Sequence, residues 1–444
     1  MNTPSFIKRL IRSVASPNEQ ARAKRQATHA IELCRALLSE RGEISGAALA
    51  REALAAYNGL IDAALPVFFD LLASAFSPDP QELDRACEDY RARPCVDTLT
   101  RLQRAVEPPR QELFRRLNMG GGTTTLVAMR RQLLSALKSR PDWKSIDADL
   151  SHLFSSWFNR GFLSLQRIDW RTPAIILEKL IQYEAVHEIS GWKDLHRRLE
   201  ADRRCFAFFH PALPDEPLIF IEVALTKGMS GAVQPLLDLD SPVTDPGTAN
   251  TAIFYSITNC QEGLRGISFG NLLIKQVAQE LGREFPRIKA FATLSPIPGF
   301  RRWVSGVAGE LAATAAGRAA LAEIARCDEA DWCKHAADAG AAQKIIMPLC
   351  AYYLIHAKHD IEPADPVARF HLGNGARLER LNWLADTSKH GMQYSAGLMV
   401  NYLYRLDEVE DNHEIYVREH RVVASHALLK LARGSPLNKL SAKR

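Results

Sequence analysis

The chain has 444 residues, of which 47% are hydrophobic and 24% are charged. This length predicts two or three domains, and the composition is typical of a globular protein. The formal net charge is +5, but basic and acidic residues are interspersed, which argues against a nucleic-acid-binding surface. No apolar run reaches the ~18 residues of a membrane-spanning helix. We therefore expect neither nucleic acid nor a membrane as a partner.

The eight cysteines are scattered along the chain. None forms a C-x-x-C pair, and no histidine cluster has zinc-site spacing, so we expect no metal site. Most cysteines are interpreted as small apolar core residues in a reducing compartment. The basic N-terminal segment is either a frayed leader on a cytoplasmic protein, which we favour, or a weak organelle-targeting peptide.

Helical periodicity dominates the N-terminal third of the chain. The clearest helical segments are residues 19–40, 46–76 and 123–139. We expect a kink or break at Pro66, and a helix start at Asp79 and Pro80. Because strand patterns are absent here, the sequence predicts an all-helical bundle over residues 1–158.

Beyond this bundle, short runs rich in β-branched and aromatic residues appear. They lie at residues 205–211, 218–225, 251–258 and 289–296. The first two are joined by a hairpin-sized connection. Helical patterns alternate with these runs, at residues 174–190, 271–282 and 307–325, and the Ala-rich residues 309–325 predict one continuous helix. The fold class expected is therefore α+β, with a mixed α/β domain over residues 159–444.

The most informative stretch is residues 251–300, where a strand pattern, a Gly-containing turn and a helix pattern follow one another. This order is typical of phosphate and pyrophosphate sites, because the N–H groups of the turn and of the helix N-terminus point at the anion. Gly266 and Gly270 allow close approach of the backbone, and Arg265 adds a positive charge. We interpret this turn as a site for a nucleotide thioester.

The same turn also matches the G-x-S-x-G nucleophile elbow of serine hydrolases, with Ser268 as nucleophile. Asp360 and His371 follow in the order that such a triad requires. The predicted strand, however, ends near Asn259, too far before Ser268 for an elbow. We therefore favour a phosphate-facing hydroxyl or a helix cap for Ser268.

A further comparison involves Arg265-x-x-Ser268-x-Gly270, which resembles the acyl-CoA-binding turn of Gcn5-related acetyltransferases, with serine in place of that turn's first glycine. Three longer blocks are more specific. They lie at residues 210–230, 291–300 and 371–404, and in this order they resemble malonyl-CoA decarboxylase.

This resemblance implies removal of CO2 from malonyl-CoA to give acetyl-CoA, without metal, biotin or another cofactor. The catalytic serine and histidine of the family fall on Ser295, in SPIPGF, and on His371, in HLGNGA. The family's CoA-phosphate loop falls on Arg265, Gly266, Ile267, Ser268, Phe269, Gly270 and Asn271. We add Asn374, which is expected to form a tight turn with Gly375, to the substrate-binding residues.

The resemblance also implies an acetyltransferase-like catalytic domain over residues 159–444. The helical domain would contribute to assembly of a homo-oligomer, either a dimer or a tetramer.

The reaction itself explains the need for such residues. Loss of CO2 sends electrons into the thioester carbonyl, so the protein must stabilise an enolate and then protonate its carbon. Histidine suits the protonation because its ordinary pKa is near neutrality. We assign proton donation to His371, and we expect Ser295 to hydrogen-bond the substrate carboxylate or hold the histidine in place.

Other polar residues leave alternatives open. His210 either reaches the site or, as we favour, has a structural role; Glu222 is either a buried, paired carboxylate or a supporting residue of the site. Arg301 and Arg302 either meet the substrate or are solvated. The competing functions are an acyl-CoA N-acyltransferase, a serine thioesterase or hydrolase using Ser268, and a CoA-sensing protein without activity.

Overall fold

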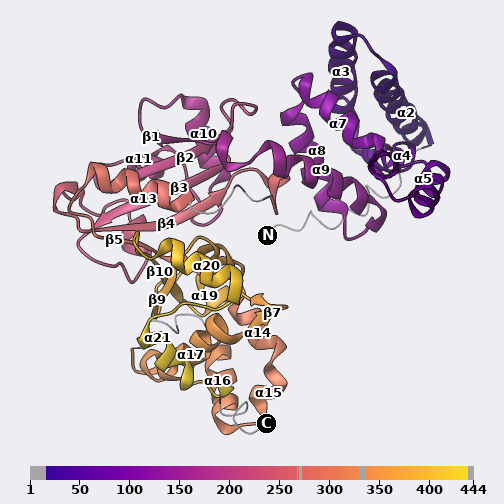
Figure 1. Cartoon of the computed structure of the whole chain (residues 1–444). Coiled ribbons are helices and arrows are strands. Elements are labelled where there is room, and N and C mark those ends of the chain that lie inside the picture. Colours follow the sequence, from indigo (N-terminus) through magenta and orange to yellow (C-terminus); the bar gives the residue numbers. More distant parts are fainter. Residues whose placement is uncertain (1–16, 268, 270–272, 330–331, 333–335, 439–444) are drawn as a thin grey trace. The chain divides into compact units, whose positions relative to one another are not determined.

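The computed structural model describes residues 17–267, 269, 273–329, 332 and 336–438. Two compact units are formed (Figure 1). The first is built from Met1–Leu163 together with His210–Pro214 and Gln261–Phe269, and the second from the remainder. The two short segments of the first unit are therefore connections between elements of the second.

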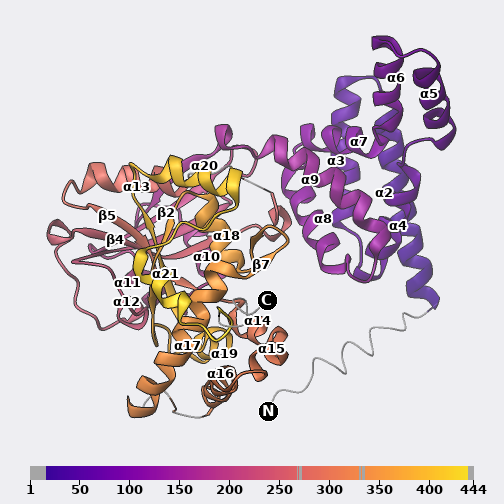
Figure 2. The same cartoon turned by 60° about the horizontal axis from the view of Figure 1, so that its bottom comes forward.

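The first unit is helical, as predicted. Its helices are α2 (Pro17–Ser39), α3 (Glu43–Asn58), α4 (Leu65–Ala75), α5 (Pro80–Ala92), α6 (Val96–Val106), α7 (Pro109–Met119), α8 (Thr123–Ala136) and α9 (Lys144–Trp157). Figure 2 shows α2, α3, α4 and α7 running beside one another, and α2 contacts each of the other three. Phe68 of α4, Phe114 of α7 and Phe154 of α9 are fully buried in this unit.

The predicted helix boundaries in this unit hold, with one shift. The chain breaks between α3 and α4, and Pro66 lies in the first turn of α4 rather than at a kink. A proline is favourable there because N–H groups in the first turn have no acceptor within the helix, so the N–H that proline lacks costs no hydrogen bond. Asp79 caps α5 by accepting from the N–H of Gln81 at 3.0 Å, with Pro80 as the first helical residue.

The second unit is organised around an eight-stranded sheet with the order β1-β2-β3-β4-β5-β10-β6, in which β9 pairs with β10. Its strands are β1 (Ser164–Ile168), β2 (Arg203–Phe209), β3 (Ile219–Thr226), β4 (Thr251–Asn259), β5 (Ala290–Thr293), β6 (Ser295–Pro296), β9 (Arg377–Asn382) and β10 (Met399–Tyr404). Only β4 and β5 pair in parallel among these described strands, and α13 (Leu273–Glu284) connects them, as a parallel pair requires.

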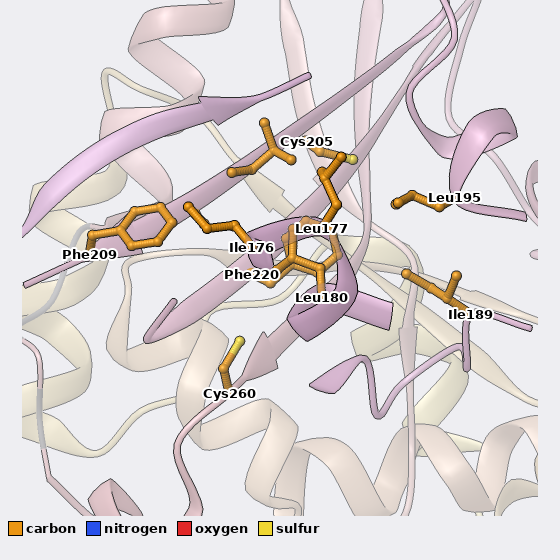
Figure 3. Close-up of a cluster of buried hydrophobic side chains, with 11 residues drawn as sticks. Ile176, Leu177, Leu180, Ile189, Leu195, Cys205, Phe209, Phe220 and Cys260 are labelled. Atoms are coloured by element: carbon orange, nitrogen blue, oxygen red, sulfur yellow. The ribbon is translucent and has the colours of Figure 1, made fainter. Parts of the chain in front are cut away.

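One face of the sheet packs on α10 (Ala174–Tyr183) and α11 (Trp192–Arg198). Figure 3 shows side chains of α10, among them Leu177 and Leu180, meeting Cys205 of β2 and Phe220 of β3. The predicted hairpin between β2 and β3 is confirmed by their antiparallel register. A helical N-terminal part followed by a mixed sheet confirms the predicted fold class.

Further helices follow along the second unit. They are α12 (Gln234–Leu237), α14 (Phe300–Gly306), α15 (Ala308–Ala312), α16 (Ala315–Arg326), α17 (Ala336–His356), α18 (Pro366–Gly373), α19 (Lys389–Ser395), α20 (Val409–Glu419) and α21 (His426–Arg433). A short hairpin joins β7 (Lys358–His359) to β8 (Glu362–Pro363).

Two helix predictions were too long. The segment 309–325 is not one helix, because Thr314 adopts an extended conformation and its hydroxyl accepts from the N–H of Gly317 at 3.0 Å, starting α16 anew. The helix expected over 174–190 ends at Tyr183, because the carboxylate of Glu184 accepts from the N–H groups of the residues that follow.

Within the described part of the chain, no single helix has the length and apolar run needed to cross a membrane. One pair, Glu43–Asn58 with Asp62–Ala92, meets the criterion jointly but is bent by 111°.

Candidate active site

The two residues predicted to be catalytic come together in the second unit. Ser295 lies on β6, where it pairs with Val400 of β10. His371 lies in the last turn of α18. Their side chains are in contact, with 3.0 Å between Ser295 Oγ and His371 Nε2, and both residues are buried.

Two further hydroxyl groups complete a hydrogen-bonded chain. Ser295 Oγ donates to Thr293 Oγ1 at 2.9 Å, and Tyr404 OH lies 2.8 Å from His371 Nδ1. Because the serine proton points at Thr293, Nε2 carries the imidazole proton and donates it to Ser295. Nδ1 then accepts from the hydroxyl of Tyr404, so these contacts assign one tautomer of a neutral ring.

The surroundings of His371 favour that neutral ring. Tyr402 stacks on the imidazole with ring centroids 4.4 Å apart, and Phe370 lies against its edge. Burial lowers the pKa of His371 from its ordinary 6.5 to about 3. The near-neutral pKa expected from residue type alone is therefore wrong for the free protein, because the folded chain removes water from the ring.

This shift predicts an acid-sensitive fold. The unfolded chain takes up a proton on His371 below about pH 6.5, whereas the folded chain does not until about pH 3. His371 therefore lowers the stability progressively as the pH falls from 6.5 toward 3. Denaturant unfolding at pH 7 and pH 5 should show a smaller loss for His371→Gln than for the wild type. An equal loss in both proteins would contradict the prediction.

Strand β10 supports both halves of the site. The backbone N–H of Tyr402 donates to Thr293 Oγ1 at 3.1 Å, and the amide of Asn401 donates to the carbonyl of Thr293 at 2.6 Å. Thr293 and Tyr404 were not singled out as functional from the sequence. The available signal was the alternation of MVNYLY, which places Tyr402 and Tyr404 on one face of the strand.

Ser295 and His371 line a cavity of about 240 Å³. Its other walls are mainly apolar and include Phe254, Ile257 and Val367. No Lys or Arg is among the described residues that line it. A carboxylate that enters this cavity loses hydration, and the only titratable cation among the described lining residues is the imidazole of His371.

The predicted CoA loop is described only in part. Ser268, Gly270 and Asn271 lie outside the described residues, whereas Arg265, Gly266, Ile267 and Phe269 lie within them. Gly266 has φ of +82°, which supports the prediction that glycine is required at this turn. Phosphate binding by this loop stays a prediction.

The start of this loop is held by the helical unit. Arg130 of α8 is buried and donates to the carbonyls of Gly263 and Arg265 at 2.8 and 2.9 Å. Gly263 lies so close to α8 that a Cβ atom there would be 2.0 Å from the carbonyl oxygen of Val127. The backbone before the predicted phosphate contacts is thus fixed by close packing.

Asn374 ends the helix that carries His371. Its amide donates to the carbonyl of Phe370 at 2.8 Å, and Gly375 follows with φ of +81°, forming the predicted tight turn. The contact stabilises the end of α18 next to His371. Binding of substrate by Asn374 stays a prediction.

The structure shows the contacts of the other residues whose roles the sequence left open. His210 belongs to the helical unit, where its Nε2 contacts the carbonyl of Trp157 at 3.0 Å, in keeping with a structural role. Glu222 is fully buried and ion-paired with Arg198 at 2.8 Å. Arg301 pairs with an aspartate, Asp328, at 2.6 Å, and Arg302 is exposed.

A hydrolase triad through Asp360 is not formed. The Asp360 side chain is 88% exposed and lies 3.4 Å from the ring of His359. The ring nitrogens of His371 contact Ser295 and Tyr404 instead. Among the described residues, no group of three His, Cys, Asp or Glu side chains is placed to hold a metal ion.

Comparison with known proteins decides the family. The model of the malonyl-CoA decarboxylase C-terminal domain matches residues 161–442, and that of the malonyl-CoA decarboxylase N-terminal domain matches residues 76–158. The chain belongs to the malonyl-CoA decarboxylase family. The resemblance inferred from the three sequence blocks is confirmed, and the chain is assigned to an enzyme family.

Relatives of known name agree with this family. The mitochondrial malonyl-CoA decarboxylase of Anser anser anser is 38% identical over 354 residues, which cover 74% of this chain and 70% of the relative. The crystal structure of malonyl-CoA decarboxylase from Rhodopseudomonas palustris has a TM-score of 0.87 and 50% identity, covering 91% of this chain and 99% of that chain. The enzyme from Cupriavidus metallidurans has a TM-score of 0.69 and 36% identity, covering 92% and 100%.

Proposed function

We propose that this member of the malonyl-CoA decarboxylase family converts malonyl-CoA to acetyl-CoA and CO2, with His371 as proton donor and Ser295 assisting. The observation that carries the proposal is the 3.0 Å contact between Ser295 and His371 at a mainly apolar cavity. Such a cavity suits a reaction that turns a charged carboxylate into neutral CO2.

The first step breaks the bond between the carboxylate carbon and the α-carbon. Its electron pair moves into the thioester carbonyl and forms an enolate. The apolar walls formed by Phe254, Ile257 and Val367 solvate the carboxylate less well than they accommodate CO2. When the substrate is bound, the hydroxyl of Ser295 turns from Thr293 and donates its hydrogen bond to the carboxylate, so that the breaking bond is held in one orientation.

The second step protonates the α-carbon. The free site holds a neutral imidazole, but the carboxylate of a bound substrate adds a negative charge that favours the imidazolium. His371 thus takes up one proton together with the substrate and gives it to the α-carbon after CO2 leaves. This uptake balances the reaction, which consumes one proton. The hydroxyl of Tyr404 at Nδ1 holds the ring orientation throughout.

Incubation of the purified chain with malonyl-CoA, without metal, ATP or amine, tests the reaction. Mass analysis should detect acetyl-CoA and CO2 in equal amounts. Free CoA with malonate would instead indicate a thioesterase, and a requirement for an amine would indicate an N-acyltransferase.

Replacing Ser295 should show how much the hydrogen bond of its hydroxyl contributes to the rate, apart from the apolar surroundings of the cavity. Ser295→Ala is expected to lower kcat by about 10²-fold, because one preorganised hydrogen bond to the reacting group is lost. The exposed Ser305, which bonds only a backbone carbonyl among its described contacts, provides the control as Ser305→Ala. Equal rates for the two variants would contradict the assignment of Ser295.

We also infer that the enzyme needs no separate cofactor, acts in the cytoplasm and forms a homo-oligomer to which the helical residues 1–158 contribute. Family membership supports the cofactor and assembly proposals. The Anser anser anser relative is named as mitochondrial, so fractionation of the source cells is the test of location. Light scattering coupled to size-exclusion chromatography would measure the assembly.

A further inference from the structure

The segment that carries Ser295 and the helix that carries His371 are linked by one buried carboxylate. We propose that Asp365 is a positioning residue that sets the distance between Ser295 and His371. The inference rests on the proposed function for the roles of these two residues. Asp365 itself is fully buried and acts through the segments that it joins.

The first link runs to the histidine helix. Asp365 is the N-cap of α18, and its Oδ1 accepts from the N–H groups of Val367 and Ala368, each at 3.0 Å. These bonds satisfy two of the N–H groups that a helix start leaves without partners. They fix the position and direction of the short helix that ends just beyond His371.

The second link runs to the serine segment. Gly299 lies against the same carboxylate, and its backbone N–H acts to lower the pKa of Asp365. Gly299 lies shortly after β6, the strand that carries Ser295, and is the N-cap residue of α14. A Cβ atom on Gly299 would lie 2.2 Å from the hydroxyl of Tyr353 and 3.4 Å from Asp365 Oδ2, so this segment is held against both groups.

The third link fixes the carboxylate itself. The hydroxyl of Tyr353 in α17 donates to Asp365 Oδ2 at 3.3 Å. The Tyr353 ring is buried and packs on Phe300 and Trp303 of α14, with centroids 5.9 and 5.0 Å apart. Burial raises the pKa of Asp365, while the N–H donors oppose that rise. One carboxylate thereby joins α14, α17 and α18.

A positioning role follows from what catalysis requires. The 3.0 Å contact between Ser295 and His371 depends on the relative placement of β6 and α18. Reacting groups displaced by about 1 Å lose on the order of 10²-fold in rate, even when the substrate still binds. Loss of the link at Asp365 should therefore lower kcat and leave KM nearly unchanged.

The variant Asp365→Asn separates this link from the helix cap. Asparagine retains an oxygen that can cap α18, but its NH2 group cannot accept from Tyr353, and it places a donor beside the backbone N–H of Gly299. We expect kcat to fall by about 10- to 100-fold with KM changed by less than about threefold. Tyr353→Phe, which removes one donor and keeps the ring, should lower kcat in the same direction by a smaller factor. Asp79→Asn, the same change at the cap of α5, is the matched control and should keep the wild-type kcat.

A readout independent of turnover completes the test. The ¹⁵N resonance of His371 Nε2 reports its hydrogen bond to Ser295, and it should shift in Asp365→Asn but not in Asp79→Asn. A wild-type kcat together with an unshifted resonance in Asp365→Asn would overturn the inference. Failure of the proposed function can be distinguished from failure of this inference. If the function is wrong, the wild-type chain produces no acetyl-CoA, and the resonance of His371 Nε2 still tests whether Asp365 positions the histidine. If Asp365→Asn does not fold, Tyr353→Phe decides by the same two measurements.

Discussion

His371→Ala is expected to lower kcat for malonyl-CoA decarboxylation by about 10²- to 10⁴-fold, the usual contribution of a positioned general acid. The variant removes the proton donor and the partner of both Ser295 and Tyr404. Rapid quench with mass detection of acetyl-CoA would measure the rate. Binding of acetyl-CoA, measured by calorimetry, should change little, because the imidazole acts mainly on the transferred proton.

A surface histidine provides the control for this prediction. The side chain of His196 is 62% exposed and contacts Glu200, away from the Ser295 contact. His196→Ala should keep the wild-type rate. If His371→Ala retained more than about a tenth of the wild-type kcat, the imidazole would not be the proton donor.

Arg198→Met is expected to lower the free energy of unfolding of the second unit by about 3–5 kcal/mol. Arg198 is buried and donates to Asp194 and Glu222, each at 2.8 Å. Methionine fills part of the space but leaves two buried carboxylates without their cation. Burial already raises the pKa of Glu222 to about 8 against the effect of Arg198, so losing Arg198 favours its protonation further. Denaturant unfolding would measure the change.

Two further variants sharpen this stability prediction. Arg198→Met combined with Glu222→Gln should recover part of the loss, because glutamine removes the cost of keeping a buried carboxyl protonated near neutral pH. Arg101→Met breaks ion pairs whose side chains are about half exposed, and such pairs contribute only about 0–1 kcal/mol. Equal destabilisation by Arg198→Met and Arg101→Met would show that the buried ion pairs contribute no more to the free energy of unfolding than the exposed ones.

The N-terminal helices and most strands could be predicted from the sequence because they depend on local patterns. Apolar spacing indicates α2 and α8, and the cap at Asp79 with Pro80 marks the start of α5. The predictions failed where a single side chain competes with the backbone pattern. Thr314 restarts a helix, and Glu184 ends one by accepting backbone N–H groups.

Part of the candidate site was also accessible from the sequence. The blocks around Ser295 and His371 resemble a family whose chemistry needs a serine and a histidine, so residue type and order were sufficient to nominate both. Their mutual contact at 3.0 Å agrees with that nomination but required the folded chain. Binding of the CoA phosphates by residues 265–271 stays a prediction, since Ser268, Gly270 and Asn271 lie outside the described residues.

The sequence by itself determined the family, the order of helices and strands, and the two residues nominated for catalysis. Only the tertiary structure decided which groups surround them. β10 lies between β5 and β6, so Tyr404 reaches His371 and the backbone of Tyr402 reaches Thr293. Burial then makes the imidazole neutral in the free protein. Helix and strand patterns can be read from local sequence. The order of the strands in the sheet and the removal of water from His371 arise instead from contacts between segments far apart in the chain.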